Sequence, residues 1–188
     1  INKTDACYQD WRKQTFAHRR EKMLRVIDVL KKNKTKYATL ISTEMGKPLA
    51  QAESEVMKCA GLCQFYAENA EKFLADEIIE TDFTKSFVTY QPLGIVFAIM
   101  PWNFPFWQVF RFIVPTLMAG NAGILKHAPT STGTALAIES IFQEAGFPQD
   151  IFRVVVIENE GAKEIINDSR ICAVTLTGSV GAGRAVGA

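Results

Sequence analysis

The spacing of hydrophobic residues changes near residue 91 and divides the chain into two parts. In the first part apolar side chains recur at alternating intervals of three and four, which is typical of amphipathic helices. One helix is expected from the capping residue Thr15 to about Asn33, a second from there to Gly46, and a long third after Pro48. The apolar stripe of the third helix is Leu49, Ala52, Val56, Cys59, Cys63, Tyr66, Ala70 and Phe73. This stripe predicts packing on other elements, and a coiled coil is the alternative.

In the second part short apolar runs alternate with amphipathic segments. After an earlier strand near residues 87–90, the runs predict strands at residues 95–99, 123–126, 152–157 and 172–177. The segments between them predict helices at residues 107–119, 131–145 and 161–167, with another near Gly181. Gly120 and Gly146 stand where the first two helices end. Strands joined by helical crossovers predict an α/β fold, an open parallel sheet with helices on both faces.

Composition narrows the class of protein without identifying a ligand. The net charge is +1, from 21 Lys and Arg against 20 Asp and Glu, so there is no electrostatic case for binding nucleic acid or an anionic membrane. The longest apolar segment, residues 104–119, is interrupted by Pro105, Arg111 and Pro115 and is shorter than the roughly 18 residues of a membrane span. The N-terminus has no signal-peptide pattern, so we expect a cytoplasmic protein.

The four cysteines, Cys7, Cys59, Cys63 and Cys172, are expected to be free thiols. Cys59 and Cys63 lie four residues apart on one face of the long helix, a spacing that two metal ligands would also show. No histidine is near them in the sequence and both fit the apolar stripe, so we expect core packing and no metal site. Cys172 starts a strand and is expected to point into the core.

A polar side chain stands between two prolines directly after the strand at residues 95–99. Pro101 and Pro105 prevent this loop from extending the strand's pairing or forming a helix at once, and Asn103 between them carries two N–H donors. Ligands of open parallel sheets bind beyond the carboxyl ends of the strands. Asn103 is therefore a candidate active-site donor.

Two further strand ends carry candidate binding residues. Lys126 is the only charge in its strand, where it could reach a ribose hydroxyl or phosphate, or could extend along the strand edge into solvent. His127 has no partner visible in the sequence, so a structural or solvent-facing role is expected. The strand at residues 172–177 leads into a glycine-rich turn, whose backbone N–H groups could receive a phosphate at the start of a helix. An ordinary loop is the alternative there.

The sequence resembles the aldehyde dehydrogenase superfamily over nearly its whole length. The segments that carry the resemblance are residues 44–48, 92–94, 100–105, 120–121, 126, 146–148 and 177–179. The Trp-Asn-Phe-Pro loop at residues 102–105 is the most specific of them. Within the superfamily the chain looks most like the bacterial succinate-semialdehyde dehydrogenases, because of residues 126–129 and 168–180.

The resemblance implies a role for each matching residue. Asn103 would be the catalytic oxyanion donor, whose amide stabilises the charge that forms on the aldehyde oxygen when a cysteine thiolate attacks. Arg111 would bind a substrate carboxylate, with a surface ion pair as the alternative. The residues that would bind the cofactor, NAD or NADP, are Pro101, Trp102, Lys126, Gly178 and Ser179. Many family members carry a glutamate that repels a 2′-phosphate three residues after the lysine, but here that residue is Pro129, so neither cofactor is favoured.

The resemblance also implies a domain organisation and an activity. Residues 1–91 would be a helical segment with one strand of the cofactor domain, and residues 92–188 the βα repeats of the NAD(P)-binding domain, with the catalytic domain absent. The family oxidises an aldehyde, here an expected succinic semialdehyde, to the carboxylate through a thiohemiacetal on a cysteine. Full-length members are expected to be homo-oligomers with no nucleic-acid or membrane partner.

The family's chemistry needs two groups whose motifs do not occur in this sequence. One is the cysteine nucleophile, and the other is a glutamate general base in a Glu-Leu-Gly-Gly segment. We therefore expect an enzyme by family whose chain is inactive alone. The alternative is a nucleotide-binding module without catalysis.

Overall fold

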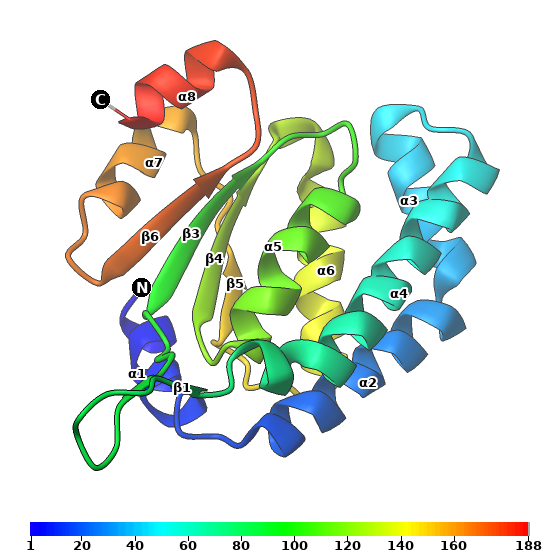
Figure 1. Ribbon diagram of the computed structural model, residues 1–188. Helices are drawn as coiled ribbons and strands as arrows, with labels where there is room; N and C mark the ends of the chain where they lie inside the picture. The colour runs from blue at the N-terminus through cyan, green and yellow to red at the C-terminus, as the bar shows by residue number, and fades with distance from the viewer. Residues whose placement is uncertain (188) are drawn as a thin grey trace.

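Residues 1–187, which the computed structural model describes, form a four-stranded parallel sheet with helices packed around it (Figure 1). The strands are β3 (Ile95–Met100), β4 (Ala122–His127), β5 (Phe152–Val154) and β6 (Ile171–Leu176), in the order β5-β4-β3-β6. The chain lays β3, β4 and β5 side by side and then crosses back to place β6 beside β3. All pairings are parallel, so the carboxyl ends of the strands meet at one edge of the sheet. The predicted open parallel sheet is confirmed.

Helices cover both faces of this sheet. Two of them, α5 (Trp107–Met118) and α6 (Thr132–Glu144), connect successive neighbouring strands and therefore lie on one face, because right-handed crossovers that step in one direction share a side. The crossover back to β6 contains α7 (Asn159–Ile166), which lies on the other side in Figure 1 and contacts β6. Helix α1 (Asn2–Trp11) packs against β3 and β4, and α8 (Val180–Gly187) follows β6.

Three helices form a further layer over α5 and α6. They are α2 (Phe16–Lys32), α3 (Lys34–Met45) and α4 (Leu49–Phe73), and α4 packs on α2, α3 and α5. The long predicted helix is confirmed, whereas the coiled-coil alternative is wrong because α4 buries its stripe against several helices. Cys59 and Cys63 are fully buried in that stripe, as expected, while Leu49 and Phe73 at its ends are about half exposed. Within residues 1–187 no helix has both the length and the apolar character that a membrane crossing requires.

Capping residues determine where several helices begin and end. The Thr15 hydroxyl accepts a hydrogen bond from the His18 N–H at 3.2 Å at the start of α2. Gly120 and Gly146 follow α5 and α6 with φ of 86° and 85°, a left-handed backbone that glycine adopts without steric cost. These predicted helix boundaries are confirmed, and each glycine turns the chain toward the next strand.

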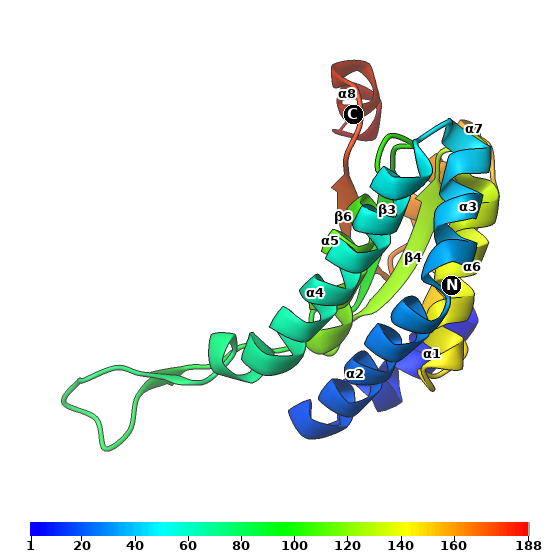
Figure 2. The same ribbon diagram turned by 90° about the vertical axis from the view of Figure 1, so that its right-hand side faces the viewer.

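Three elements differ from their predictions. Helix α1 (Asn2–Trp11) is not among the predicted helices, and β5 ends at Val154 instead of residue 157. The strand expected near residues 87–90 is β2 (Phe87–Val88), which pairs antiparallel with β1 (Glu77–Ile78) and not with the parallel sheet. Figure 2 shows this hairpin projecting away from the rest of the fold.

The expected orientation of Cys172 is wrong. Its side chain is exposed, as is that of Val174 two residues further along β6. Within the described residues β6 pairs only with β3, so it is an edge strand. Alternate side chains of a strand point to opposite faces, and on β6 the face that carries Cys172 is left largely uncovered.

Candidate functional site

The strand register brings the three predicted strand ends together. Met100 at the end of β3 is paired with His127 at the end of β4, and Ile99 is paired with both Lys126 and Leu176. The segments that follow these residues therefore leave the sheet as neighbours. They are the loop at residues 101–106, which we call the Asn103 loop, residues 128–131, and the glycine-rich segment at residues 177–183.

The Asn103 loop presents its polar side chain to solvent. Asn103 is exposed, and within residues 1–187 its side-chain amide makes no hydrogen bond, so both of its N–H donors are available. Trp102 and Phe104 on either side of it are 53% and 47% exposed. Phe106, by contrast, is fully buried and stacks on Phe110 with ring centroids 5.9 Å apart. The loop is thus anchored in the core at its end and open at its tip.

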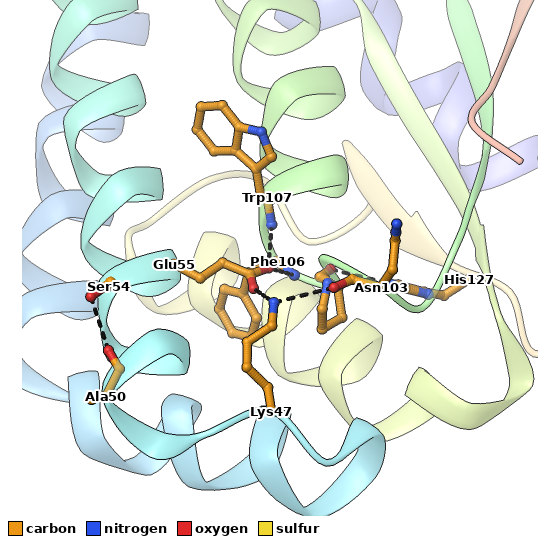
Figure 3. A network of polar contacts seen from close by, with 9 residues as sticks. Lys47, Ala50, Ser54, Glu55, Asn103, Phe106, Trp107 and His127 are labelled. Carbon is orange, nitrogen blue, oxygen red and sulfur yellow. Dashed lines mark hydrogen bonds and ion pairs between the residues drawn. The ribbon is translucent and has the colours of Figure 1, made fainter.

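A buried carboxylate on α4 binds the end of the loop (Figure 3). Glu55 Oε1 accepts hydrogen bonds from the backbone N–H groups of Phe106 at 2.9 Å and Trp107 at 3.0 Å. These groups belong to the first turn of α5, where a negative charge is favoured by the helix dipole. Glu55 Oε2 forms an ion pair with Lys47, whose Nζ also donates to the Asn103 carbonyl oxygen at 3.2 Å.

His127 binds the same loop from the sheet. Its Nδ1 accepts a hydrogen bond from the Ala128 N–H at 2.8 Å, which assigns the ring proton to Nε2. Nε2 then donates to the Pro105 carbonyl oxygen at 3.0 Å. Burial disfavours the charged ring and lowers the pKa of His127. Of the two roles expected for this residue, the structural one is confirmed.

Lys126 points into a cavity of about 370 Å³ at the carboxyl ends of β3, β4 and β6. The cavity is lined by Ile99, Lys126, Asn159, Ala162, Lys163, Ile166, Asn167, Leu176, Ala182, Ala185 and Val186. No carboxylate is among these side chains. Lys126 is only 4% exposed, and within the described part of the chain it has no ion pair or hydrogen bond from its side chain. An ammonium at the wall of this cavity that has no partner within residues 1–187 is available to bind a polar or anionic group that enters it.

The glycine-rich segment is exposed at the start of α8. The Ser179 hydroxyl accepts a hydrogen bond from the Ala182 N–H at 3.1 Å and so caps this helix. Gly178 and Ser179 are both exposed and do not line the cavity that contains Lys126. A Cβ built on Gly178, Gly181 or Gly183 would make only ordinary contacts, at 3.5 Å or more. These glycines leave room above the backbone that the rest of the described chain does not use.

Arg111 lies one turn beyond Trp107 on α5 and is exposed. It forms no ion pair with any residue in the described range, so the alternative of a surface ion pair has no support here. The Lys58 ammonium lies over the Trp107 ring, 4.0 Å from its centroid. The surface of α5 next to the Asn103 loop is therefore cationic.

Sequence reasoning missed Glu55 and Lys47. Glu55 stands within the buried stripe of α4, beside Val56 and between Ala52 and Cys59. An acidic residue inside an apolar stripe is the signal that could have identified it, because a buried carboxylate requires a partner. The partner could not be named from the pattern, since α5 reaches Glu55 only in the folded chain.

The chain has extensive similarity to known proteins. The sequence model of the aldehyde dehydrogenase family matches residues 1–188. A probable NADP(+) succinate-semialdehyde dehydrogenase of Synechocystis is 51% identical over 94% of this chain and 39% of its own length. An NAD(P)+ succinate-semialdehyde dehydrogenase of Escherichia coli is 44% identical over 97% of this chain and 40% of its own. The chain therefore spans about two fifths of the length of these relatives.

A solved structure shows the same architecture. The succinic semialdehyde dehydrogenase of Streptococcus pyogenes, determined in complex with NADP+, superposes with a TM-score of 0.95 at 31% identity. The superposition covers 99% of this chain and 41% of that one. The elements described above are thus arranged as in one portion of a larger known fold.

Proposed function

This chain belongs to the aldehyde dehydrogenase family, and on that premise we propose that it supplies the dinucleotide-binding part and the oxyanion-stabilising loop of an NAD(P)-dependent dehydrogenase. The proposed substrate is succinic semialdehyde, in line with the names of the relatives. The observation that carries the proposal is the position of Lys126, which lines a largely apolar cavity at the ends of three strands and has no ion pair within residues 1–187.

The cavity suits the adenosine end of a dinucleotide. Its walls include the apolar side chains of Ala162, Ile166 and Val186, which suit a flat base, and Lys126 supplies donors for ribose hydroxyls. Pro129 places no carboxylate three residues after this lysine, so a 2′-phosphate would meet no repulsion at that residue. The proposed cofactor is therefore NAD or NADP, which supplies a hydride acceptor when bound.

The pyrophosphate is proposed to lie on the glycine-rich segment. Gly178 and Ser179 directly precede α8, whose first backbone N–H groups and dipole favour an anion. Pro101 and Trp102, on the neighbouring strand end, would line the path of the cofactor from this segment toward Asn103. Each of these residues is at least partly exposed, so a ligand can reach it.

The Asn103 loop and α5 are proposed to form the aldehyde side of the site. The free amide of Asn103 would donate to the aldehyde oxygen as negative charge develops there. Removing one oxyanion-hole donor costs about 3 kcal/mol of transition-state stabilisation in a serine protease. Arg111 would bind the carboxylate of the substrate, because its guanidinium offers a planar set of donors and has no partner within residues 1–187.

None of the four cysteines suits the role of nucleophile. Burial raises the pKa of both Cys59 and Cys63, and also that of Cys7, so their reactive thiolates are disfavoured. Cys172 lies near the start of β6, at the opposite end of the sheet from Asn103. We therefore expect this chain by itself to bind the cofactor without oxidising the aldehyde.

Calorimetric titration of the chain with NADP+ and NAD+ tests the cofactor site. Lys126→Met should weaken binding about tenfold or more, because a hydrogen bond to a charged group contributes roughly 1.5–3 kcal/mol. Lys31→Met, at an exposed position on α2, is the matched control and should leave binding unchanged. Absence of binding by the unaltered chain would contradict the proposal. Reduction of NADP+ in the presence of succinic semialdehyde would contradict the expected inactivity.

A further inference from the structure

A buried ion pair lies beneath the Asn103 loop, and the chemistry proposed above assigns it no role. The side chains of Lys47 and Glu55 are 8% and 3% exposed. They come from the segment between α3 and α4 and from α4 itself, so neither belongs to the sheet that carries the loop. We propose that Glu55 and Lys47 are positioning residues that fix the direction in which Asn103 presents its amide.

The contacts of the pair support this role because they reach both the tip of the loop and its end. Glu55 fixes the end of the loop through the N–H groups of Phe106 and Trp107, at 2.9 and 3.0 Å. Lys47 fixes the tip through the carbonyl oxygen of Asn103, and its ammonium lies 4.0 Å from the centroid of the Phe104 ring. Figure 3 shows the carboxylate and the ammonium meeting between these two sets of contacts.

The chemistry of the pair is matched to these partners. A carboxylate offers acceptors only, so Glu55 can bind two N–H groups with one oxygen and Lys47 with the other. A glutamine has only one acceptor oxygen, so its NH₂ group would face either the Lys47 ammonium or the two backbone N–H groups. In both orientations a donor would meet a donor. Lys47 in turn offers several donors, which it divides between Glu55 and the loop carbonyl.

A positioning role differs from a purely structural one in what an apolar replacement would restore. Buried ion pairs are often replaced by apolar side chains without loss of stability. An apolar pair at these positions would refill the space, but it would supply no bond to the Asn103 carbonyl or to the start of α5. The double variant Lys47→Met/Glu55→Leu should therefore keep its stability but lose the order of the Asn103 loop.

The experiment follows the side-chain amide of Asn103 by NMR in the 188-residue chain, with its signal assigned through Asn103→Asp. In the unaltered chain one sharp amide pair is expected. In Lys47→Met/Glu55→Leu the melting temperature should stay within a few degrees, while the Asn103 signal splits or broadens. Backbone amide exchange of Phe106 and Trp107 should become at least tenfold faster.

The matched control is Lys34→Met/Glu53→Leu, which removes a more exposed ion pair between α3 and α4, with a separation of 2.9 Å, that does not touch the loop. It should leave the Asn103 signal unchanged. An unchanged Asn103 signal in Lys47→Met/Glu55→Leu would overturn the proposal. If that double variant does not fold, Glu55→Gln gives the same readout, because it removes the charge with little change in volume.

The positioning role rests on the proposed function, because it assumes that the Asn103 amide acts on the substrate. The two proposals can nevertheless fail separately. NADP+ binding depends on the Lys126 cavity and should change less than twofold in Lys47→Met/Glu55→Leu. If the unaltered chain does not bind NADP+, the proposed function fails while the NMR result still decides whether the pair orders Asn103. If NADP+ binds and the Asn103 signal is insensitive to the pair, only the positioning role fails.

Discussion

The Asn103 loop and the glycine-rich segment leave the same edge of the sheet, from adjacent strands, but the protein supports them very differently. The Asn103 loop is held by the buried side chains of Glu55, Lys47 and His127, which come from α4, from the segment before it and from β4. The glycine-rich segment is held to the sheet at its first residue, where the Thr177 N–H donates to the Ile99 carbonyl oxygen at 3.1 Å. The residues after Thr177 are largely exposed and have local bonds such as that from the Ala182 N–H to the Ser179 hydroxyl. The Asn103 loop is fixed by side chains of other parts of the chain, whereas residues 178–183 have local hydrogen bonds.

This difference matches what each segment is proposed to do. An amide that stabilises charge in a transition state is effective only if it is already in position when that charge appears. A phosphate can instead be received by backbone N–H groups at a helix start, and the ligand itself contributes to the order of that segment. We therefore expect changes around the Asn103 loop to affect stability first, and changes in the glycine-rich segment to affect ligand binding first.

The largest effect is expected for Glu55→Ala. Removing one member of a buried ion pair leaves Lys47 uncompensated and two N–H groups of α5 without an acceptor, so the free energy of unfolding should fall by about 3–5 kcal/mol. Urea unfolding measures this difference. Glu53→Ala, which removes a more exposed carboxylate on the same helix, should lower the free energy of unfolding much less, because solvent screens an exposed ion pair. Equal effects of the two changes would show that the bonds of Glu55 to Lys47 and the start of α5 contribute no particular stability.

The next effect concerns His127, whose neutral ring donates a hydrogen bond to the Pro105 carbonyl oxygen. Because its pKa is lowered in the folded chain, the unfolded chain binds a proton at higher pH. The stability that His127 contributes is therefore complete above about pH 6.5 and is lost as the pH falls below it, by at most about 1.4 kcal/mol per pH unit. Unfolding curves between pH 5 and 8 should show this loss, and His127→Gln should abolish it.

The other histidine provides the control for this prediction. His18 lies at the start of α2, far from the loop in sequence, and contributes a backbone N–H rather than a buried ring to the Thr15 cap. His18→Gln should keep the pH dependence of the unaltered chain. If His127→Gln keeps it as well, His127 does not couple protonation to the order of the loop.

A smaller effect on stability, with a larger one on binding, is expected for Gly181→Ala. This glycine lies in α8, and an added Cβ would meet only the Ser179 hydroxyl at 3.7 Å. The change should leave stability unchanged or raise it by up to about 1 kcal/mol, because alanine favours helix. NADP+ binding should weaken, because the methyl group would occupy space proposed for the pyrophosphate.

Gly61→Ala is the matched control, since Gly61 is also helical and an added Cβ there meets nothing within 4 Å. It should raise stability in the same way and leave NADP+ binding unchanged. Gly181→Ala with unchanged affinity would show that the glycine-rich segment does not contact the ligand.

The two segments also differ in how far the sequence could predict them. The convergence of Asn103, Lys126 and Ser179 followed from reading the strands as parallel, because parallel strands end at one edge. The support of the Asn103 loop did not follow, because Glu55 and His127 bind backbone groups, and backbone groups carry no sequence signal. Their partners become known only when α4 and α5 are packed together.

The errors at β6 have a related cause. The apolar pattern of Cys172 and Val174 predicted a strand, and the strand is present, but the pattern does not tell an edge strand from a central one. Which face is covered depends on where neighbouring elements pack. Periodicity therefore predicted the element correctly and the burial of Cys172 incorrectly.

The smallest effect is expected at the other end of β6, where Asp168 and Arg170 hold the turn that leads into the strand. Hydrogen bonds from the Arg170 guanidinium and N–H lower the pKa of Asp168 to about 2. Its contribution to stability is present above the unfolded-state pKa of about 3.9 and is lost as the pH falls through about 2. Asp168→Asn should therefore lower the melting temperature slightly at pH 6 and not at pH 2, whereas Asp82→Asn in the exposed hairpin should do neither. If Asp168→Asn lowers the melting temperature at pH 6 but leaves NADP+ affinity unchanged, the bonds of Asp168 stabilise the start of β6 and do not affect the ligand site. The glycine-rich segment at the other end of β6 would then be ordered by the ligand and not by this turn.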